Sequence, residues 1–488
     1  MAIYIGADLG TSSVKLTAAN DSGKILAESQ REYALDCPHP GWKEIDPKRW
    51  TDALDSALQE LLDTVGRSEI RGIGVTGQMH TVVPLDRAGQ PVRPALMWND
   101  LRTADLVDEL NEALPGTAET EMIRRILSTG SPAANLYWIK KNEPENYRRI
   151  SSFLIAPDYI VYYLTGIYGT DYCEASTSSL YDIVTREWSE PMRSLLGLSA
   201  DAYPDVKGAC TKAGVLRDEL KKHFGLEQDV YVVTGTGDNP AAAIATGCLD
   251  GGYPVFSIGT SGVVMFPRKK LLTEAKGKNI LFSKDGVEFS YLVQGGIQSA
   301  GSSYQWLTKD LLHADSFTSE LDAVGPAAPD DGGVMFYPHL LGDKTLYADP
   351  SLKGAFFGLS TDTSRANLII AVMEGISFAA RELFEAMQAP EEFDSVRVIG
   401  GGSKSPVGMQ IIADIFGMPA VQLSGKGGAG LGAAILSMEA DGIIPEFSGG
   451  DDGSENDRIY IPNAGKSAER EEKYRKYRRI HQALCVIG

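Results

Sequence analysis

The alternation of apolar and polar residues in the first part of the chain predicts short strands joined by turns. Ile3–Asp8 is an apolar run that ends in a carboxylate, and Val14–Ala19 has a similar composition. A turn is expected at Asp21–Lys24, where polar residues and a glycine follow. The chain is therefore expected to open as a β-meander.

A long amphipathic helix is predicted next. Asp46 is placed as its N-cap, Pro47 takes the first helical position, and apolar residues recur on one face as far as Val65. The strand Ile70–Val75 then leads into Gly77–His80. Because open α/β sheets bind ligands at the carboxyl ends of their strands, this last segment is expected to lie at a binding site.

The second half of the chain repeats this order of elements. We expect strands at Pro254–Gly259, Val263–Phe266 and Leu292–Gly296, and a long core helix over Arg365–Met387.

Two glycine-rich segments follow in the second half. Residues 396–406 are predicted to form a strand that runs into a glycine turn, with a helix at 407–416 behind it, and residues 425–440 repeat the pattern of glycines and then a helix. The segment Thr246–Gly251 is taken as the boundary between the halves, which gives domains at 1–246 and 247–488.

A short turn occurs twice. The sequence DLGTSSVK (8–15) has a near copy, IGTSGVV, at 258–264. A Gly-Thr-Ser turn between two strands brings N–H groups and hydroxyls close to a phosphate, although neither copy is a P-loop. A tight β-turn without a ligand explains either copy alone. The recurrence in both halves, with Asp8 beside the first copy, favours two turns that grip one polyphosphate.

Composition and charge narrow the classes of function. The 488 residues suggest two sizeable domains. The net charge of −19 repels phosphate backbones and anionic lipid, so we expect no nucleic acid and no membrane as partner, and a small metabolite instead. The N-terminus has no signal-peptide pattern and no run of about 18 apolar residues occurs, so a cytoplasmic protein is expected.

The cysteines and histidines indicate neither disulfides nor a zinc site. The five cysteines are odd in number and scattered without a CxxC pair, and the six histidines are equally dispersed. Any metal is therefore expected to arrive with a substrate.

Several motifs together resemble the actin-like ATPase superfamily, in which two ribonuclease-H-like domains each contribute a phosphate hairpin and a third, glycine-rich element holds adenosine. DLGTSSVK resembles the first hairpin, SIGTSGV (257–263) the second, and VIGGGSKSP (398–406) the adenosine segment. Over nearly its whole length the chain is similar to the FGGY carbohydrate kinases. The supporting motifs are PGWKEIDPKRW (40–50), GQMHTVVPLD (77–86), PALMWNDLRT (94–103), GTGDNPAAAIATG (235–247) and GAFFGLSTDTSRANLIIAVMEGISF (354–378).

This resemblance implies an α/β fold of two ribonuclease-H-like domains with an interdomain catalytic cleft, which is expected to close on its substrates. Domain 1–246 would carry the sugar site, the first hairpin and the catalytic aspartate, and domain 247–488 the second hairpin and the adenosine site. Gln78-Met79-His80 and the WND sequence at 98–100 are most similar to the xylulokinase branch. The implied reaction is phosphorylation of D-xylulose by ATP with Mg²⁺.

The resemblance also implies roles for single residues. Asp238 would be the general base, and Asp8 would hold Mg²⁺ through water, with Asp238 as a second carboxylate near the metal. The implied substrate-binding residues are Gln78, Met79, His80, Trp98 and Asn239. The implied nucleotide-binding residues are Gly10, Thr11, Ser12, Lys15, Gly259, Thr260, Ser261, Gly400, Gly401, Gly402 and Ser403.

Each of these residues also has a purely structural interpretation. A lone histidine such as His80 is often a satisfied core or surface residue, and Asp238-Asn239-Pro240 fits a helix start with Asp or Asn as N-cap and Pro at the first position. Met79 alone would be assigned to a core, and Trp98 could pack beneath the pocket. The glycines at 400–402 and 427–432 could serve close helix–sheet packing.

The sequence departs from the family pattern at a few places. Thr81 and Leu101 stand where xylulokinases usually have glycine, so extra atoms are expected on the sugar side. Leu346 replaces a common proline, and Asp343-Lys344 replaces Glu-Arg. D-xylulose is the first expectation, and another ketopentose, a ketohexose or a polyol is the alternative.

Two other classes of protein are alternatives to a kinase. A sugar-responsive regulator on the same fold would normally carry an added DNA-binding segment, and the acidic chain does not favour one. A chaperone-type or filament-type ATPase would not need a GDN base facing a polyol pocket. The sequence leaves open whether the protein forms a homodimer.

Overall fold

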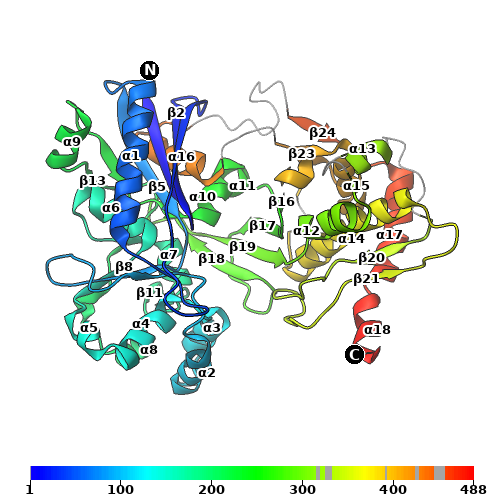
Figure 1. Cartoon of the computed structure of the whole chain (residues 1–488), viewed down its shortest axis with the longest axis horizontal. Coiled ribbons are helices and arrows are strands. Elements are labelled where there is room, and N and C mark those ends of the chain that lie inside the picture. The colour runs from blue at the N-terminus through cyan, green and yellow to red at the C-terminus, as the bar shows by residue number, and fades with distance from the viewer. Residues whose placement is uncertain are drawn as a thin grey trace. The chain divides into compact units, whose positions relative to one another are not determined.

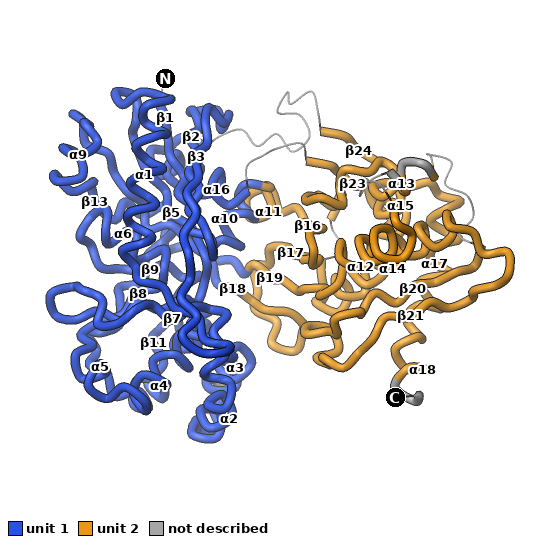
Figure 2. The backbone as a smooth tube through the Cα atoms, in the orientation of Figure 1, with its two compact units in different colours: residues 1–245, 280–291, 427–446 blue, residues 246–279, 292–426, 447–488 orange. Residues whose placement is uncertain are grey.

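The computed structural model describes residues 2–314, 319–324, 332–390, 393–423, 428–444 and 457–487. The chain forms two compact units, which Figure 2 distinguishes by colour. Unit 1 consists of residues 1–245, 280–291 and 427–446, and unit 2 of residues 246–279, 292–426 and 447–488. The first break falls beside the boundary expected at 246. The sequence predicts two contiguous domains, whereas the chain returns to unit 1 twice, at 280–291 and at 427–446.

Unit 1 is built on a seven-stranded sheet with the order β13-β14-β5-β1-β2-β3, and β15 also pairs with β5 (Figure 1). The strands of unit 1 are β1 (Ile3–Leu9), β2 (Ser13–Asn20), β3 (Ile25–Glu32), β4 (Glu44–Ile45), β5 (Ile70–Gly77), β6 (Val82–Leu85), β7 (Ala95–Leu96), β8 (Ser152–Ile155), β9 (Thr170–Asp171), β10 (Tyr181–Asp182), β11 (Glu187–Trp188), β12 (Val206–Lys207), β13 (Lys212–Val215), β14 (Tyr231–Val233) and β15 (Thr236–Gly237). β1, β2 and β3 pair antiparallel in sequence, so the predicted meander is confirmed.

The helices of unit 1 are α1 (Pro47–Val65), α2 (Ala104–Ala113), α3 (Ala118–Ile126), α4 (Pro132–Asn142), α5 (Pro144–Arg149), α6 (Ala156–Thr165), α7 (Tyr172–Thr177), α8 (Glu190–Leu196), α9 (Asp218–Phe224), α10 (Asp238–Ala245) and α16 (Gly428–Ala440). Helix α1 has the predicted bounds and the predicted cap, because the Asp46 side chain accepts a hydrogen bond from the N–H of Lys48. Its buried face, which includes Trp50, Leu54 and Leu58, packs in the core of the sheet.

Helix α16 joins unit 1 late in the sequence and packs tightly on the sheet. A Cβ atom added to Gly6 would lie 1.7 Å from the carbonyl oxygen of Gly430, and one added to Gly74 would lie 1.8 Å from that of Ala433. Gly432 approaches the carbonyl oxygen of Ala241 in α10 equally closely. The packing interpretation is therefore correct for Gly430 and Gly432, while residues 424–427 lie outside the described part of the chain.

A second seven-stranded sheet has the order β18-β19-β17-β16-β22-β23-β24, and β20 pairs with β21. These strands are β16 (Val255–Ile258), β17 (Gly262–Arg268), β18 (Lys278–Phe282), β19 (Ser290–Ile297), β20 (Met335–Tyr337), β21 (Ala355–Phe357), β22 (Val396–Ile399), β23 (Ala420–Gln422) and β24 (Arg458–Tyr460). The strands expected at 254–259, 263–266 and 292–296 are thus confirmed within one or two residues.

The helices of unit 2 are α11 (Cys248–Gly251), α12 (Gly301–Gln305), α13 (Ser319–Val324), α14 (Arg365–Ala386), α15 (Pro406–Phe416), α17 (Ala464–Tyr477) and α18 (Ile480–Ile487). Helix α14 is the predicted core helix and is capped by Ser364, whose side chain accepts from the N–H of Asn367. Within the described residues, no helix has both the length and the apolar character needed to cross a membrane.

Candidate active site

Three strand ends meet in register in unit 1. β1 and β15 both run parallel to β5, and both Leu9 and Gly237 are paired with Gly77. The residues that follow these three positions are the first Gly-Thr-Ser hairpin, the segment from Gln78 to His80, and Asp238. The structure therefore brings together at one sheet edge three segments that are far apart in the sequence, at the place where open α/β sheets bind ligands.

The first hairpin is held by hydrogen bonds within its turn and from two neighbouring side chains. The N–H of Gly10 donates to the carbonyl oxygen of Ser13 over 2.9 Å, and the hydroxyl of Tyr33 donates to Gly10 O. The amide of the buried Gln78 also donates to Gly10 O, from Nε2 over 3.1 Å. Gln78, which was expected to bind substrate, thus uses its amide to support the hairpin.

Two carboxylates of this edge interact. Burial, together with the nearby negative charge of Asp8, raises the pKa of Asp238 to about 7. Burial also raises the pKa of Asp8, while the positive charge of Lys15 acts in the opposite direction. Lys15 stands opposite Asp8 in the register of the hairpin, and its Nζ is 2.7 Å from Glu28 Oε1.

The helix that carries Asp238 differs from the one expected. α10 begins at Asp238 itself, directly after β15, so Asp238 is the first helical residue and Pro240 the third. The expectation of Pro240 at the first helical position is therefore wrong. The short β15 aligns Gly237 with Gly77, which leaves the Asp238 carboxyl at the strand end.

The residues expected to contact sugar lie around this edge. Met79 is buried, and its Sδ is 3.7 Å from Nδ2 of Asn239. His80 has a backbone φ of 70°, a left-handed conformation that is uncommon for residues other than glycine. Trp98 is 44% exposed rather than packed beneath a pocket, and its Nε1 donates to Thr11 Oγ1 over 3.1 Å.

Sequence reasoning missed a group of buried acids behind Asp238. A Cβ atom added to Gly237 would lie 3.0 Å from Glu174 Oε1. Burial, together with the negative charges of Asp158 and Asp171, raises the pKa of Glu174 well above its usual range. Burial also raises the pKa of Asp171 to about 6. The sequence around Glu174 does not indicate that it lies beside Gly237, because the two residues are more than sixty positions apart in the sequence.

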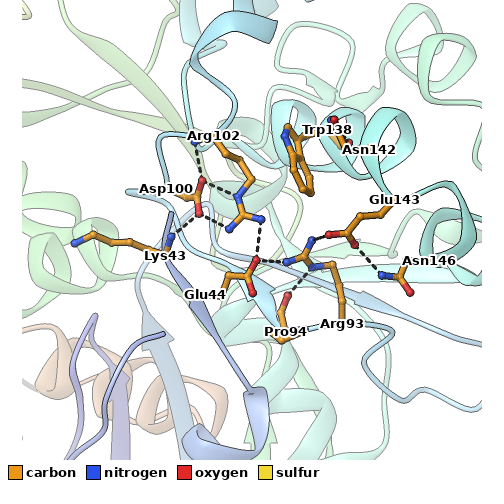
Figure 3. Close-up of polar contacts among 10 residues, drawn as sticks. All are labelled: Lys43, Glu44, Arg93, Pro94, Asp100, Arg102, Trp138, Asn142, Glu143 and Asn146. Carbon is orange, nitrogen blue, oxygen red and sulfur yellow. Dashed lines mark hydrogen bonds and ion pairs between the residues drawn. The ribbon is translucent and has the colours of Figure 1, made fainter. Parts of the chain in front are cut away.

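The segment after Trp98 is anchored by buried ion pairs, which Figure 3 shows. The guanidinium of Arg102 lies 2.8 Å from Asp100 Oδ2 and 2.7 Å from Glu44 Oε1. Arg93 also pairs with Glu44. The Arg102 guanidinium carbon lies 3.9 Å from the centre of the Trp42 ring. This cluster fixes the loop of the WND sequence to the PGWKEI segment.

The residues that depart from the family pattern have different surroundings. Thr81 is fully buried, and whether it adds atoms to the sugar side stays a prediction. Leu101 is 61% exposed and lies against Gly41. Leu346 is half-buried and packs on the core of unit 2, while Asp343 next to it is buried and accepts from the N–H of Tyr347.

The second hairpin lies in unit 2 between β16 and β17. Gly259, Thr260 and Ser261 are all exposed, and the N–H of Gly259 donates to Ser261 O over 3.0 Å. The N–H of Gly301, the first residue of α12, donates to Gly259 O over 2.9 Å. Both hairpins thus close through the N–H of their glycine, and the second one exposes Thr260 and Ser261.

The glycines at 400–402 follow β22 in unit 2. Gly401 and Gly402 line a pocket of about 20 Å³ together with Tyr304, Met373 and other residues. Gly400 has a φ of 92°, which favours glycine, and the buried Ser403 donates from its hydroxyl to Gly400 O over 2.9 Å. The Ser403 hydroxyl thus supports the turn, and contact of Gly401 and Gly402 with a nucleotide stays a prediction.

The two carboxylates of the unit 1 site are relevant to metal binding. Among the described residues, no three histidine, cysteine or acidic side chains are grouped so as to hold a metal ion by themselves. The mutual repulsion of Asp8 and Asp238 would be relieved by a divalent cation that takes its other ligands from water and phosphate. The residues present therefore fit a cation that arrives with a nucleotide.

Comparison with known proteins identifies the family. The model of the N-terminal domain of the FGGY family of carbohydrate kinases matches residues 3–245, and that of the C-terminal domain matches residues 255–440. The xylulose kinase of Staphylococcus xylosus is 32% identical over 450 residues, which cover 92% of this chain and 93% of that protein. The xylulose kinase of Escherichia coli (strain K12) is 30% identical over 498 residues, which cover 99% of this chain and all of that protein.

A solved structure has the same fold over the whole chain. The crystal structure described as a "xyloylose kinase" from Brucella ovis superposes with a TM-score of 0.89 at 30% identity and covers 100% of both chains. The α/β architecture expected from the resemblance, the actin-like ATPase fold, is thereby confirmed. The chain belongs to the FGGY family of carbohydrate kinases, which transfer phosphate from ATP to a sugar.

Proposed function

We propose that this protein phosphorylates D-xylulose with ATP to give D-xylulose 5-phosphate and ADP. The proposal depends on one observation. The carboxylates of Asp8 and Asp238 influence each other's charge at the strand edge where Met79 and His80 also lie. The relatives named xylulose kinase, which match almost the full length of the chain, support D-xylulose as the sugar. Another ketose or a polyol is the alternative that the first experiment below tests.

Asp238 is assigned as the general base. The sugar hydroxyl attacks the γ-phosphorus, the bond from that phosphorus to the bridging oxygen breaks, and ADP leaves while Asp238 accepts the hydroxyl proton. A base with a pKa of about 7 is better matched to this task at neutral pH than an ordinary aspartate. In phosphoryl transfer through a loose transition state, the alignment of the hydroxyl and neutralisation of phosphate charge supply most of the rate.

The sugar is assigned to Met79, His80, Trp98 and Asn239, and Gln78 is assigned to support of the hairpin. The phosphates are assigned to the two hairpins, through Gly10, Thr11, Ser12, Gly259, Thr260 and Ser261, and adenosine to the glycine turn of Gly400, Gly401 and Gly402. Lys15 is paired with Glu28, so we assign it to the charge balance of Asp8 rather than to direct contact.

Mg²⁺ is proposed as the metal, with Asp8 holding it through water. A hard cation of this kind neutralises charge on the transferred phosphoryl group. Asp8 is half-buried and faces the positive charge of Lys15, and we assign its carboxylate to a hydrated cation.

The test is an ADP-release assay over a panel of ketopentoses, ketohexoses, polyols and gluconate, with Asp238→Ala as the control variant. Turnover on D-xylulose that disappears in Asp238→Ala supports the proposal. Turnover on another acceptor alone would reassign the sugar. The cytoplasmic location and the homodimer stay separate expectations, to be checked by cell fractionation and by sedimentation velocity.

A further inference from the structure

A ring of hydrogen bonds joins the first hairpin to Trp98 through a buried threonine. The hydroxyl of Thr81 donates to Gln78 Oε1 over 3.2 Å and accepts from the main-chain N–H of Trp98 over 3.1 Å. Gln78 Nε2 continues to Gly10 O, and the indole of Trp98 returns to the hairpin at Thr11 Oγ1, both over 3.1 Å. Thr81 is thus hydrogen-bonded to Gln78 and to Trp98, and each of these two residues makes a second hydrogen bond to the first hairpin.

The surroundings of Thr81 make its hydroxyl hard to replace. The side chain is fully buried, as is the amide of Gln78, so no bulk water is at hand to take over either hydrogen bond. Removing the hydroxyl while its partners remain leaves the Trp98 N–H and Gln78 Oε1 without their acceptor and donor. Loss of the hydroxyl therefore frees the Trp98 main chain from one of its hydrogen bonds.

The rest of the Trp98 loop is fixed independently. Asp100 accepts from the N–H of Lys43 over 2.6 Å and from Arg102, and the Arg102 guanidinium has no exposed surface (Figure 3). Loss of the Thr81 hydroxyl is therefore expected to shift Trp98 locally while the ion-paired loop stays folded.

We propose that Thr81 is a positioning residue that couples sugar binding to the phosphate hairpin by holding Trp98 and Gln78 in one arrangement. The inference rests on the proposed function, because it assigns Trp98 to the sugar and Thr11 to the phosphates. It extends that function by a residue that contacts neither substrate. A purely structural threonine would affect stability alone, whereas a positioning residue affects recognition of the sugar.

The experiment compares four variants of the full-length protein. Thr81→Val and Thr81→Ala remove the hydroxyl, and Thr81→Ser retains it. Thr120→Val is the matched control, because Thr120 is also fully buried and accepts a main-chain N–H, that of Thr117, at the start of α3. Steady-state kinetics with D-xylulose and Mg-ATP and thermal unfolding are measured for each variant.

Thr81→Val and Thr81→Ala are expected to raise the KM for D-xylulose about tenfold, the size expected when a buried hydrogen-bonding group loses its partner. The KM for ATP and the kcat should change less than threefold, and Thr81→Ser should recover at least half of the loss. Thr120→Val should lower the melting temperature by a similar amount without raising the sugar KM. Equal sugar KM values in Thr81→Val, Thr120→Val and the wild type would overturn the inference.

A second measurement separates this inference from the proposed function. Trp98 is the most exposed of the tryptophans in the described residues, so acrylamide quenching reports on it, with Trp98→Phe as the blank. The part of the quenching that is lost in Trp98→Phe is due to Trp98. Thr81→Val should change this part, even if no sugar supports turnover in the wild type. Unchanged quenching would overturn the coupling, and absent turnover with changed quenching would overturn only the proposed function.

Discussion

The indole Nε1 of Trp98 donates a 3.1 Å hydrogen bond to Oγ1 of Thr11, so an exposed aromatic side chain is tied to the tip of the first Gly-Thr-Ser hairpin. The two residues are 87 positions apart in the sequence. In the proposed function the indole lies at the sugar and the hairpin at the phosphates. The bond therefore links the proposed sugar site to the proposed phosphate site within unit 1.

Trp98→Phe keeps an aromatic ring and removes this bond. We expect the KM for D-xylulose to rise about five- to tenfold, because a net hydrogen bond contributes about 1 kcal/mol. Steady-state kinetics check this. Trp188→Phe is the control, since it removes a 3.0 Å indole bond to Pro204 O that is not part of the site. A sugar KM that rises as much in Trp188→Phe would contradict the account.

The pH dependence follows from the pKa of Asp238. A general base must be deprotonated, so kcat/KM should fall about tenfold per pH unit below a pKa of about 7 and level off above it. Because the charge of Asp8 is the second cause of that raised pKa, Asp8→Asn should move the fall to lower pH in its residual activity. A pH profile of both proteins measures this, and an unchanged midpoint would mean that the two carboxylates do not interact.

Burial raises the pKa of Glu174 well above its usual range, which favours the protonated form more than in an exposed glutamate. Glu174→Gln should keep turnover within about twofold, since the amide has a size and shape similar to the protonated acid. Glu174→Ala should lower kcat more than tenfold, because it opens space beside Gly237 and so frees the start of α10. A Gln variant as impaired as the Ala variant would show that Glu174 acts as an anion.

The ion cluster of Arg102 should matter for stability. Arg102→Met leaves Asp100 and Glu44 buried without their cation and should cost about 3–5 kcal/mol of unfolding free energy. Urea unfolding measures this cost. Lys48→Met is the matched control: it removes an exposed pair with Asp52 and should leave the unfolding free energy nearly unchanged. Similar costs in the two variants would contradict the role assigned to the cluster.

Local patterns in the sequence predict the elements of this fold well. The cap at Asp46 and the apolar stripe to Val65 define α1, and the spacing over 365–387 defines α14 almost to the residue. These signals depend on neighbours within a few positions. The placement of α16 in unit 1 depends on contacts such as Gly6 with Gly430, which no local pattern reports.

The site was predicted only in part for the same reason. Asp8 and the two hairpins are recognisable from their residue types, whereas Asp238 is identified only through the family resemblance. The register of β1, β5 and β15 brings the unit 1 members to one edge. The use of the Gln78 amide to hold Gly10 and the burial of Thr81 depend on side-chain directions. Residue type and spacing do not determine those directions, so the sequence does not predict that the Thr81 hydroxyl bonds to Gln78 and Trp98.

The central claim is that Asp238 takes the proton of a D-xylulose hydroxyl during transfer from ATP. The most direct measurement is phosphorus NMR of the product formed from D-xylulose and Mg-ATP by the wild type and by Asp238→Asn, which keeps the size of the side chain. The account predicts D-xylulose 5-phosphate from the wild type and a rate at least a thousandfold lower from Asp238→Asn. Equal rates, or phosphate released from ATP without a sugar phosphate, would contradict it.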